Sequence, residues 1–445
     1  MKLNKLFKIT ILAAASVLAT ACVHYQPTTA LDSPGYEPLE VSSTSLAGKS
    51  LPAHKIEPGQ ALDLTTLELL AVSHNPHLVE RRTQMHVQEL ELVTAGMLPE
   101  PVFSGGRDHP ISGPDHFTAW NNSLGFDLTS LLIHRKLKQF SQLQSESIHL
   151  NLLWQEWLIL GQVRSTCFQL SFDEKLITLL NEETLFNTTL LDRQKRAVEQ
   201  GLLIRPVLLE TEHHVLAIKS MLHDAQEEKA RDFGRLHDLL GINPDITLKL
   251  APLPLLKMPL NPQELIDRRP DLLALRRAAQ AGDIGLRMAI VEQFPDLSLG
   301  LNDSRDTADN HTLGLSVQLP LSFLGQTQAR ARLAEARRMD AETTYRLRLA
   351  QGQRDLRWLK EQIRLQQTRV KQANSTWLII CAPMAHWQSL LNQGVVTLEM
   401  VESQNRSCLE RHLDLVREQH KLDLLQLDVM TLSGYVPEWE RIQHV

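Results

Sequence analysis

Two stretches of about seventy residues, 129–200 and 326–393, are each predicted to form one very long helix. Apolar residues recur in them three and four positions apart, as at Leu176, Leu179 and Leu180, and this spacing marks one face of a helix. At ~1.5 Å per residue, each helix would extend roughly 105 Å. No globular core is that deep, so the two helices must pair lengthwise with others. Neither is apolar for 18 consecutive residues, so we expect both to face water rather than to cross a bilayer.

The two long helices belong to two copies of a unit of about 190 residues. Four proline or glycine positions of the first unit recur in the same order in the second, at offsets of 194, 196, 193 and 193 residues. The pairs are Pro76 and Pro270, Pro99 and Pro295, Gly201 and Gly394, and Gly241 and Gly434. We therefore expect a first repeat at 61–250 and a second at 251–435. Each would hold a short helix, a proline-opened helix, a β-hairpin, the long helix and, after a glycine turn, a helix of about 34 to 38 residues. The fold class is thus mainly α with a small β part. Pro383 is expected to break or kink the second long helix.

Four strands are expected, at about 101–107 and 117–128 in the first repeat and about 295–303 and 311–321 in the second. Apolar and polar residues alternate in them, as where Leu315 and Val317 flank Ser316. Such alternation over about ten residues is typical of a transmembrane barrel strand around a wet lumen. A half-buried hairpin on a soluble sheet would show the same pattern, so both interpretations stay open.

Four strands are too few for a closed barrel, which needs about eight. In a membrane, an open sheet edge would leave unpaired backbone groups that cost several kcal/mol each. If the strands lie in the membrane, several chains must share one barrel. Three chains would supply twelve strands and two chains would supply eight.

The N-terminus is predicted to be a processing signal. Basic residues at Lys2, Lys5 and Lys8 precede an apolar stretch that is too short to span a membrane, so we expect a signal peptide at 1–21. The small residues before Cys22 resemble the lipobox of bacterial lipoproteins, which implies acylation of this cysteine. The alternative is an ordinary secretory signal with a chance cysteine near its cleavage site. Residues 22–60 are expected to form a tether and 436–445 a C-terminal tail.

The remaining cysteines, Cys167, Cys381 and Cys408, are far apart in the sequence. Three such thiols predict neither a disulfide framework nor a zinc site, so we expect buried apolar residues on helices.

Composition and motifs exclude several function classes. The net charge of −6 with 22% charged residues indicates no nucleic-acid surface. We find no nucleophile motif, phosphate loop or acid–base constellation, so an enzyme is not expected. The histidine pairs His74/His77 and His213/His214 lack further ligands, so we expect no metal site and no cofactor.

Three motifs carry a family resemblance: Arg268-Arg269-Pro270-Asp271-Leu272, Ala95-Gly96-Met97-Leu98-Pro99 and Leu319-Pro320-Leu321. In this order they resemble the TolC-like outer-membrane efflux channels, across nearly all of 61–435. The resemblance implies a homotrimer with a twelve-stranded barrel in the bacterial outer membrane and a helical tunnel in the periplasm. It also implies a lipid-anchored exit duct for small molecules or metal cations, with a periplasmic adaptor and an inner-membrane pump as partners. A type I protein secretion channel and a lipid-tethered periplasmic coiled-coil scaffold without a pore are the alternatives.

The resemblance also assigns residues at the two helical tips. Gly201-Leu202-Leu203 and Gly394-Val395-Val396 match the tip motif that contacts the adaptor, and glycine permits the tight reversal. Any helix–turn–helix would need such a glycine, which is the simpler explanation.

Glu399 and Glu402 follow the second tip three positions apart, on one helical face. The family has two aspartates in this region, which form acidic rings at the tunnel mouth. Threefold symmetry would make each glutamate a ring of three carboxylates that favours cations and gates the pore. A solvated helix face is the alternative.

Overall fold

The computed structural model describes residues 61–114, 116–256, 258, 261, 266–294, 297–319 and 325–434, together with four two-residue strands. These strands form two antiparallel pairs within the predicted tether, β1 (Glu40–Val41) with β4 (His54–Lys55) and β2 (Ser45–Leu46) with β3 (Lys49–Ser50). The predicted signal peptide, Cys22, Pro295, Pro320, Leu321 and the C-terminal tail lie outside the described residues.

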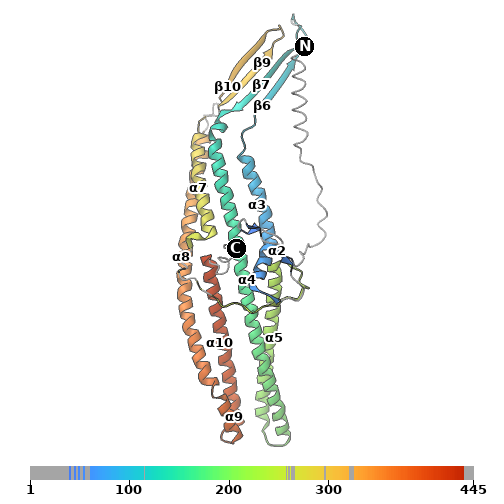
Figure 1. The fold of residues 1–445 in the computed structure, drawn as a ribbon, viewed down its shortest axis with the longest axis vertical. Coiled ribbons are helices and arrows are strands. Elements are labelled where there is room, and N and C mark those ends of the chain that lie inside the picture. The colour runs from blue at the N-terminus through green and yellow to red at the C-terminus, as the bar shows by residue number, and fades with distance from the viewer. Residues whose placement is uncertain are drawn as a thin grey trace. The chain divides into compact units, whose positions relative to one another are not determined.

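Both halves of the described chain hold the predicted elements in the predicted order, except that a 3₁₀ helix of three residues takes the place of the short helix in the second half (Figure 1). The first half contains α2 (Leu64–His74), α3 (Pro76–Ala95), β6 (Val102–Asp108), β7 (Ala119–Asp127), α4 (Leu128–Glu199) and α5 (Arg205–Leu240). The second half contains η1 (Ile266–Arg268), α7 (Pro270–Val291), β9 (Ser298–Arg305), β10 (His311–Gln318), α8 (Gln326–Cys381), α9 (Met384–Asn392) and α10 (Leu398–Ser433). The parallel pair of β5 (Ala61–Leu62) and β8 (Lys249–Leu250) joins the two ends of the predicted first repeat.

Helix α4 confirms the prediction of a very long helix. Its 72 residues correspond to about 108 Å at 1.5 Å per residue. The Asp127 carboxylate caps its start by accepting from the Ser130 amide at 3.2 Å. As expected from its length, α4 packs lengthwise, against α3 and α7 towards the strands and against α5 towards the opposite end (Figure 1). Helix α8 packs likewise against α7 and α10.

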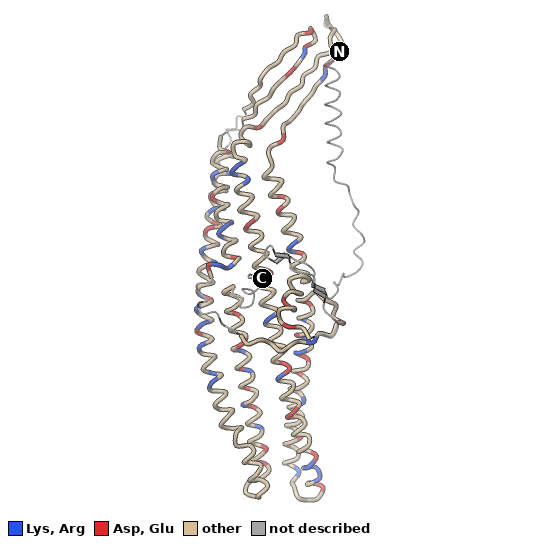
Figure 2. Tube along the Cα trace, in the orientation of Figure 1, with Lys and Arg blue, Asp and Glu red and all other residues tan. Residues whose placement is uncertain are grey.

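The expected break at Pro383 is confirmed. Helix α8 ends at Cys381 and the chain continues as the separate helix α9. The physical cause is the missing amide hydrogen of proline, which the carbonyl of Ile379 would otherwise accept. Figure 2 shows charged residues spread along most of the helices but few in the strands, and residues 372–398, on both sides of this break, include no Lys, Arg, Asp or Glu.

The cores lie between the paired helices. One gathers where α2, α4 and α5 meet, with Leu67, Leu70, Val163, Leu170, Leu236 and Leu240 fully or almost fully buried. A second joins η1, α7, α8 and α10 through Ile266, Leu272, Leu356, Leu359 and Val429. Cys167 is completely buried in the first core, as expected. Burial raises the pKa of its thiol to about 12, so this cysteine is a packing residue and not a reactive one.

The expectation of three separate thiols is wrong for the other two cysteines. Cys381 at the end of α8 and Cys408 in α10 form a disulfide, with their Cα atoms 5.1 Å apart. The two residues are 27 positions apart in the sequence, which gives no pairing signal. They meet because α8 and α10 pack side by side and place the two positions opposite each other.

Candidate functional site

The four long strands form one antiparallel sheet in the order β10-β9-β7-β6. The predicted alternation becomes a two-faced sheet because the strands pair in register. Phe103, Leu124, Leu301 and Leu315 lie in one row across all four strands, and Phe126, Leu299 and Val317 lie in the next. The opposite face carries rows such as Ser104, Ser123, Asn302 and Gly314. Hydroxyl groups pair across it, with Ser304 Oγ 2.7 Å from Thr312 Oγ1.

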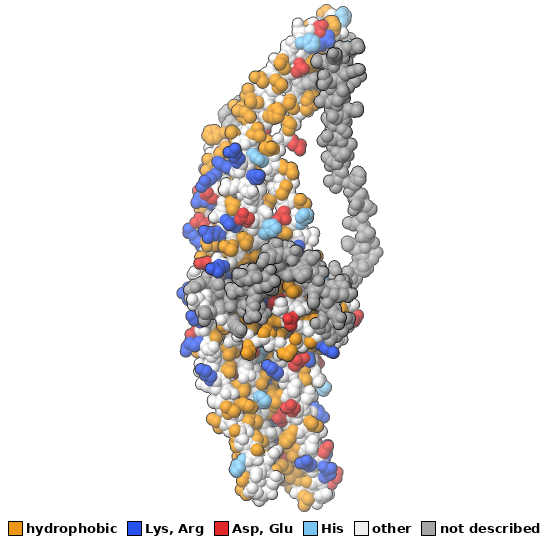
Figure 3. All heavy atoms as spheres, in the orientation of Figure 1, with side chains coloured by type: hydrophobic (Ala, Val, Ile, Leu, Met, Phe, Trp, Pro, Cys, Tyr) orange, Lys and Arg blue, Asp and Glu red, His pale blue; other side chains and the backbone are white. Residues whose placement is uncertain are grey.

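The apolar face of this sheet is uncovered in the single chain. Leu315 is 84% exposed, Leu313 74% and Val317 65%. Hydrophobic side chains gather over the strands in Figure 3, whereas Lys and Arg gather beyond them on the helices. An exposed apolar patch of this kind marks a surface that meets lipid or another protein.

The sheet is also open at both sides. Strands β6 and β10 are its outer strands, and each has one described neighbour, β7 and β9 respectively. Each outer strand therefore has one ladder of backbone donors and acceptors free for pairing with a further strand.

The two helical tips are built alike. Gly201 and Gly394 have φ values of 71° and 72°, in the left-handed region that favours glycine. The Leu202 amide donates to the Ala197 carbonyl at 2.8 Å, and the Val395 amide donates to the Leu390 carbonyl at 3.0 Å. These bonds close each helix in the same way and reverse the chain.

The tips expose apolar side chains. Leu202 and Val395 are largely exposed, whereas Leu203 and Val396 are half-buried. Ile204 is exposed as well. It was not among the tip residues predicted from the sequence, although it directly follows them. Each tip thus presents a small apolar surface with a glycine at its turn.

The predicted acidic pair is divided between two environments. Glu399 is exposed in the first turn of α10, where the positive end of the helix dipole favours a carboxylate. Glu402 is half-buried; it accepts hydrogen bonds from the Gln194 amide of α4 and, at 3.4 Å, from the Thr211 hydroxyl of α5. Burial raises the pKa of Glu402. Within one chain, Glu399 faces solvent and Glu402 joins three helices.

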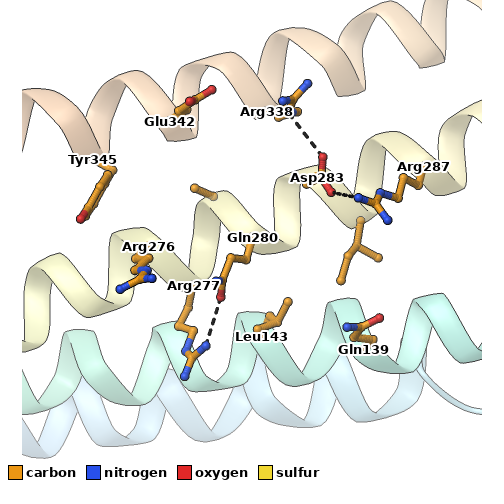
Figure 4. A pocket seen from close by; sticks show the side chains of 12 residues that line it. Gln139, Leu143, Arg276, Arg277, Gln280, Asp283, Arg287, Arg338, Glu342 and Tyr345 are labelled. Carbon is orange, nitrogen blue, oxygen red and sulfur yellow. Dashed lines mark hydrogen bonds and ion pairs between the residues drawn. The ribbon is translucent and has the colours of Figure 1, made fainter.

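A cavity of about 700 Å³ lies between α4, α7 and α8 and is rich in arginine (Figure 4). Asp283 bridges two of its guanidinium groups, Arg287 at 2.8 Å and Arg338 at 3.5 Å. Arg277 reaches Gln280 at 3.1 Å and Glu146 at 2.8 Å. The lining residues hold neighbouring helices together and contain no nucleophile paired with a base.

The Arg-Pro-Asp motif is a buried structural cluster. Arg269 is 1% exposed and binds Asp271 through two bonds of 3.0 and 2.7 Å. It also donates to the Leu432 carbonyl at 3.2 Å, and its guanidinium lies 4.6 Å above the Trp154 ring. The motif therefore joins the start of α7 to the last turn of α10 and to α4.

Two buried carboxyl groups, Asp173 on α4 and Asp232 on α5, lie together between these helices. Burial, with a further contribution from Asp232, raises the pKa of Asp173 to about 6, against the opposing hydrogen bond from Gln169. One Asp173 oxygen has no hydrogen-bond partner. Because the folded protein binds this proton more tightly than the unfolded chain, folding stability decreases as the pH rises from about 4 to about 6.

Replacing Asp173 by Asn should therefore stabilise the protein at neutral pH. With 1.36 kcal/mol per pKa unit, the expected gain is about 2 to 3 kcal/mol at pH 7, and the stability change between pH 4 and 6 should shrink. Thermal unfolding of the detergent-solubilised protein across this pH range measures both effects. Asp192→Asn, at an exposed position of the same helix, is the control and should change neither. Unaltered pH dependence in Asp173→Asn would show that another group carries it.

Among the described residues, no group of three or more His, Cys, Asp or Glu side chains is placed to hold a metal ion. Nor does any helix in the described ranges have an apolar stretch long enough to span a bilayer.

No protein-family model matches this chain, and neither does any curated protein. Solved structures do share its fold. CusC, studied for folding and transmembrane channel formation, is 15% identical with a TM-score of 0.72, covering 94% of this chain and 100% of CusC. The outer membrane protein VceC of Vibrio cholerae is 16% identical with a TM-score of 0.71, covering 83% and 96%. The open state of the Neisseria gonorrhoeae MtrE outer membrane channel is 15% identical with a TM-score of 0.67, covering 83% and 88%.

Likeness at these identities establishes the fold alone. The neighbours are outer-membrane channel proteins and not enzymes. The long paired helices, the single four-stranded sheet and the order of elements are thus those of a known architecture. The chain has the fold of the TolC-like outer-membrane channels, the family that its sequence motifs resemble.

Proposed function

We propose that this chain is one subunit of an outer-membrane channel, the passive exit duct of a tripartite efflux system. It would carry small molecules or metal cations from an inner-membrane pump and a periplasmic adaptor to the outside. The observation that carries the proposal is the uncovered apolar face of a sheet whose other face is polar. Lipid on one side and a wet lumen on the other satisfy both faces.

The two open sheet edges support a barrel shared by several chains, and the resemblance to the TolC-like channels implies that there are three of them. In the hydrocarbon region every backbone donor and acceptor needs a partner, so β10 of one chain would pair with β6 of the next. Three chains then close a barrel of twelve strands. The long helices of the three chains would continue it as a tunnel through the periplasm.

We also infer that the two halves of the chain are copies of one unit. Equivalent contacts support this inference. The Asn75 side chain donates to the Leu239 carbonyl at 2.9 Å in the first half, and Arg269 donates to the Leu432 carbonyl at 3.2 Å in the second. Both contacts join the start of a proline-opened helix to the last turn before a glycine.

The tips are proposed to contact the adaptor. Each tip is an apolar turn with one largely exposed aliphatic residue, Leu202 or Val395, which suits docking against a helical hairpin. The proposed contact residues are Gly201, Leu202 and Leu203 at the first tip and Gly394, Val395 and Val396 at the second. Glu399 and Glu402 are proposed as the acidic gate near the second tip. Their different burial suggests a division of roles, with Glu399 setting the charge at the mouth and Glu402 holding α10 against α4 and α5.

Export and anchoring complete the proposal. Residues 1–21 would direct secretion, and acylated Cys22 would anchor the mature chain in outer-membrane lipid. The Cys381–Cys408 disulfide favours an extracytoplasmic location, because disulfides persist in oxidising compartments.

Conductance in a planar bilayer tests channel and gate together. The purified protein should give cation-selective currents, and Glu399→Gln should lower the cation-to-anion permeability ratio severalfold, because each chain loses one carboxylate at the mouth. Glu402→Gln should change selectivity less, since this side chain is already hydrogen-bonded between helices.

Glu199→Gln is the matched control. It removes an exposed carboxylate beside the first tip, where no acidic ring is proposed, and should leave selectivity unchanged. Equal selectivity in Glu399→Gln and the wild type would be compatible with a channel but would contradict the role of Glu399 in an acidic gate. Folded protein that never inserts would instead favour the periplasmic scaffold without a pore.

A further inference from the structure

Three neighbouring contacts hold the C-terminal end of α8 against α10. The Trp377 and His412 rings lie 5.2 Å apart, Cys381 is bonded to Cys408, and the Gln404 amide donates to the Ile380 carbonyl at 2.9 Å. The three α10 residues are four positions apart and therefore lie on one helical face. Gln404 also satisfies a carbonyl that the end of the helix leaves without an amide partner.

Beyond these contacts, the second tip is weakly packed. Helix α9 follows the break at Pro383 and contains no buried residue. A cavity of about 440 Å³ is lined by α4, α9 and α10, with Leu185, Phe186 and Leu391 among its apolar residues. The disulfide closes a loop that includes the break, α9, Gly394 and both predicted gate glutamates.

The first tip has no such connection. Helix α4 continues unbroken to Glu199, next to the turn. Thr188 and Val215 lie 193 residues before Cys381 and Cys408, so the corresponding positions carry no sulfur. The second tip combines a broken helix with a covalent link, and the first combines a continuous helix with none.

We propose that Cys381 and Cys408 are an oxidation site, closed after export by an oxidising thiol–disulfide exchange protein, and that the closed loop holds the second tip in its folded shape. In the reaction, one cysteine thiolate attacks the disulfide of the oxidising protein and forms a mixed disulfide. The second thiolate then displaces the partner, which leaves as a dithiol. The two cysteine thiols lose two protons and two electrons in total, and the partner protein takes up both electrons and two protons as its disulfide becomes a dithiol.

Holding the tip is the physical consequence of this bond. The two cysteines are 27 positions apart, and their cross-link lowers the number of conformations that the segment between them can adopt when it unfolds locally. Without the bond, α9 would detach more often, because few buried contacts hold it. The proposal requires export of the chain, as in the proposed function, but it does not depend on a pore or on adaptor binding.

Digestion of the folded, full-length exported protein with thermolysin, which cuts before large aliphatic residues, tests the pairing. Leu202 at the first tip and Val395 at the second are exposed, so each tip offers a site for the protease, and the fragment ends show which bond was cut. After denaturation without reductant, the two fragments produced by a cut before Val395 should remain joined by the Cys381–Cys408 disulfide and should separate only when reductant is added. Fragments cut before Leu202 should separate without reductant.

Cutting rates test the restraint. In the double variant Cys381→Ser/Cys408→Ser, cleavage before Val395 should accelerate by on the order of tenfold or more, while cleavage before Leu202 keeps its rate. If this variant does not fold, wild-type protein that is reduced and alkylated after folding provides the same comparison.

Two results would overturn the proposal. Alkylation of Cys381 and Cys408 in unreduced exported protein would exclude the oxidation. Equal cutting rates before Val395 in the oxidised and sulfur-free proteins would exclude the restraint. Loss of conductance with the disulfide intact would count against the channel and leave this inference standing.

Discussion

Placing arginine at Leu315 and Val317 should abolish membrane assembly of the protein. Both side chains lie on the apolar face of the edge strand β10 and are largely exposed in the single chain. If that face meets lipid, each charge costs roughly 2 to 4 kcal/mol near the middle of the bilayer. The two costs together rival the whole stability of an ordinary domain. We expect the double variant to be absent from the outer-membrane fraction and to form no heat-resistant trimer on gels.

Ser316→Arg/Gln318→Arg is the matched control, because it adds the same charges to the same strand on the polar face. This variant should assemble, since arginine in a wet lumen keeps its hydration. Normal heat-resistant trimers in the Leu315/Val317 variant would refute the assignment of that face to lipid. Failure of both variants would indicate that β10 tolerates no arginine and would leave the face unassigned.

Much of the fold could be predicted from the sequence, because local patterns of residue type determine where its helices, turns and strands lie. Helix α4 is predicted to within one residue at each end, since its apolar spacing persists along its whole length. The glycines that close α5 and α10, Gly241 and Gly434, have positive φ like the two tip glycines, a conformation that other residues rarely adopt. Alternation predicted the two faces of the sheet because successive residues of a strand point to opposite sides.

Features that depend on helix packing were not predictable in the same way. The spacing of Glu399 and Glu402 places both on one side of α10, but only packing against α4 and α5 shows that Glu402 turns between the helices. The Cys381–Cys408 bond depends on the register of α8 against α10, which no local pattern reveals. The motif with Arg269 gave the family resemblance, while its physical role required its distant contacts to be known.

Those distant contacts predict a large loss of stability in Arg269→Ala. The change removes a guanidinium that is 1% exposed, its two bonds to Asp271 and its position over Trp154, and it leaves the Leu432 carbonyl without this donor. Breaking a buried ion pair of this kind costs about 3 to 5 kcal/mol. Asp271 keeps a second partner in Arg348 at 2.9 Å, so the loss should lie near the lower value. Thermal unfolding of the solubilised protein, followed by helical circular dichroism, measures the change.

Two further variants separate this role from a general need for positive charge. Arg268→Ala, at the exposed neighbouring position, should change stability by less than about 0.5 kcal/mol. Arg269→Lys keeps the charge but cannot make two parallel bonds to a carboxylate while also donating to Leu432, so it should recover less than half of the loss. Equal damage from Arg268→Ala and Arg269→Ala would contradict the cluster. The forked shape of the guanidinium is what connects α7, α10 and Trp154 of α4. Full recovery of stability by lysine would therefore show that only the positive charge is needed at this position.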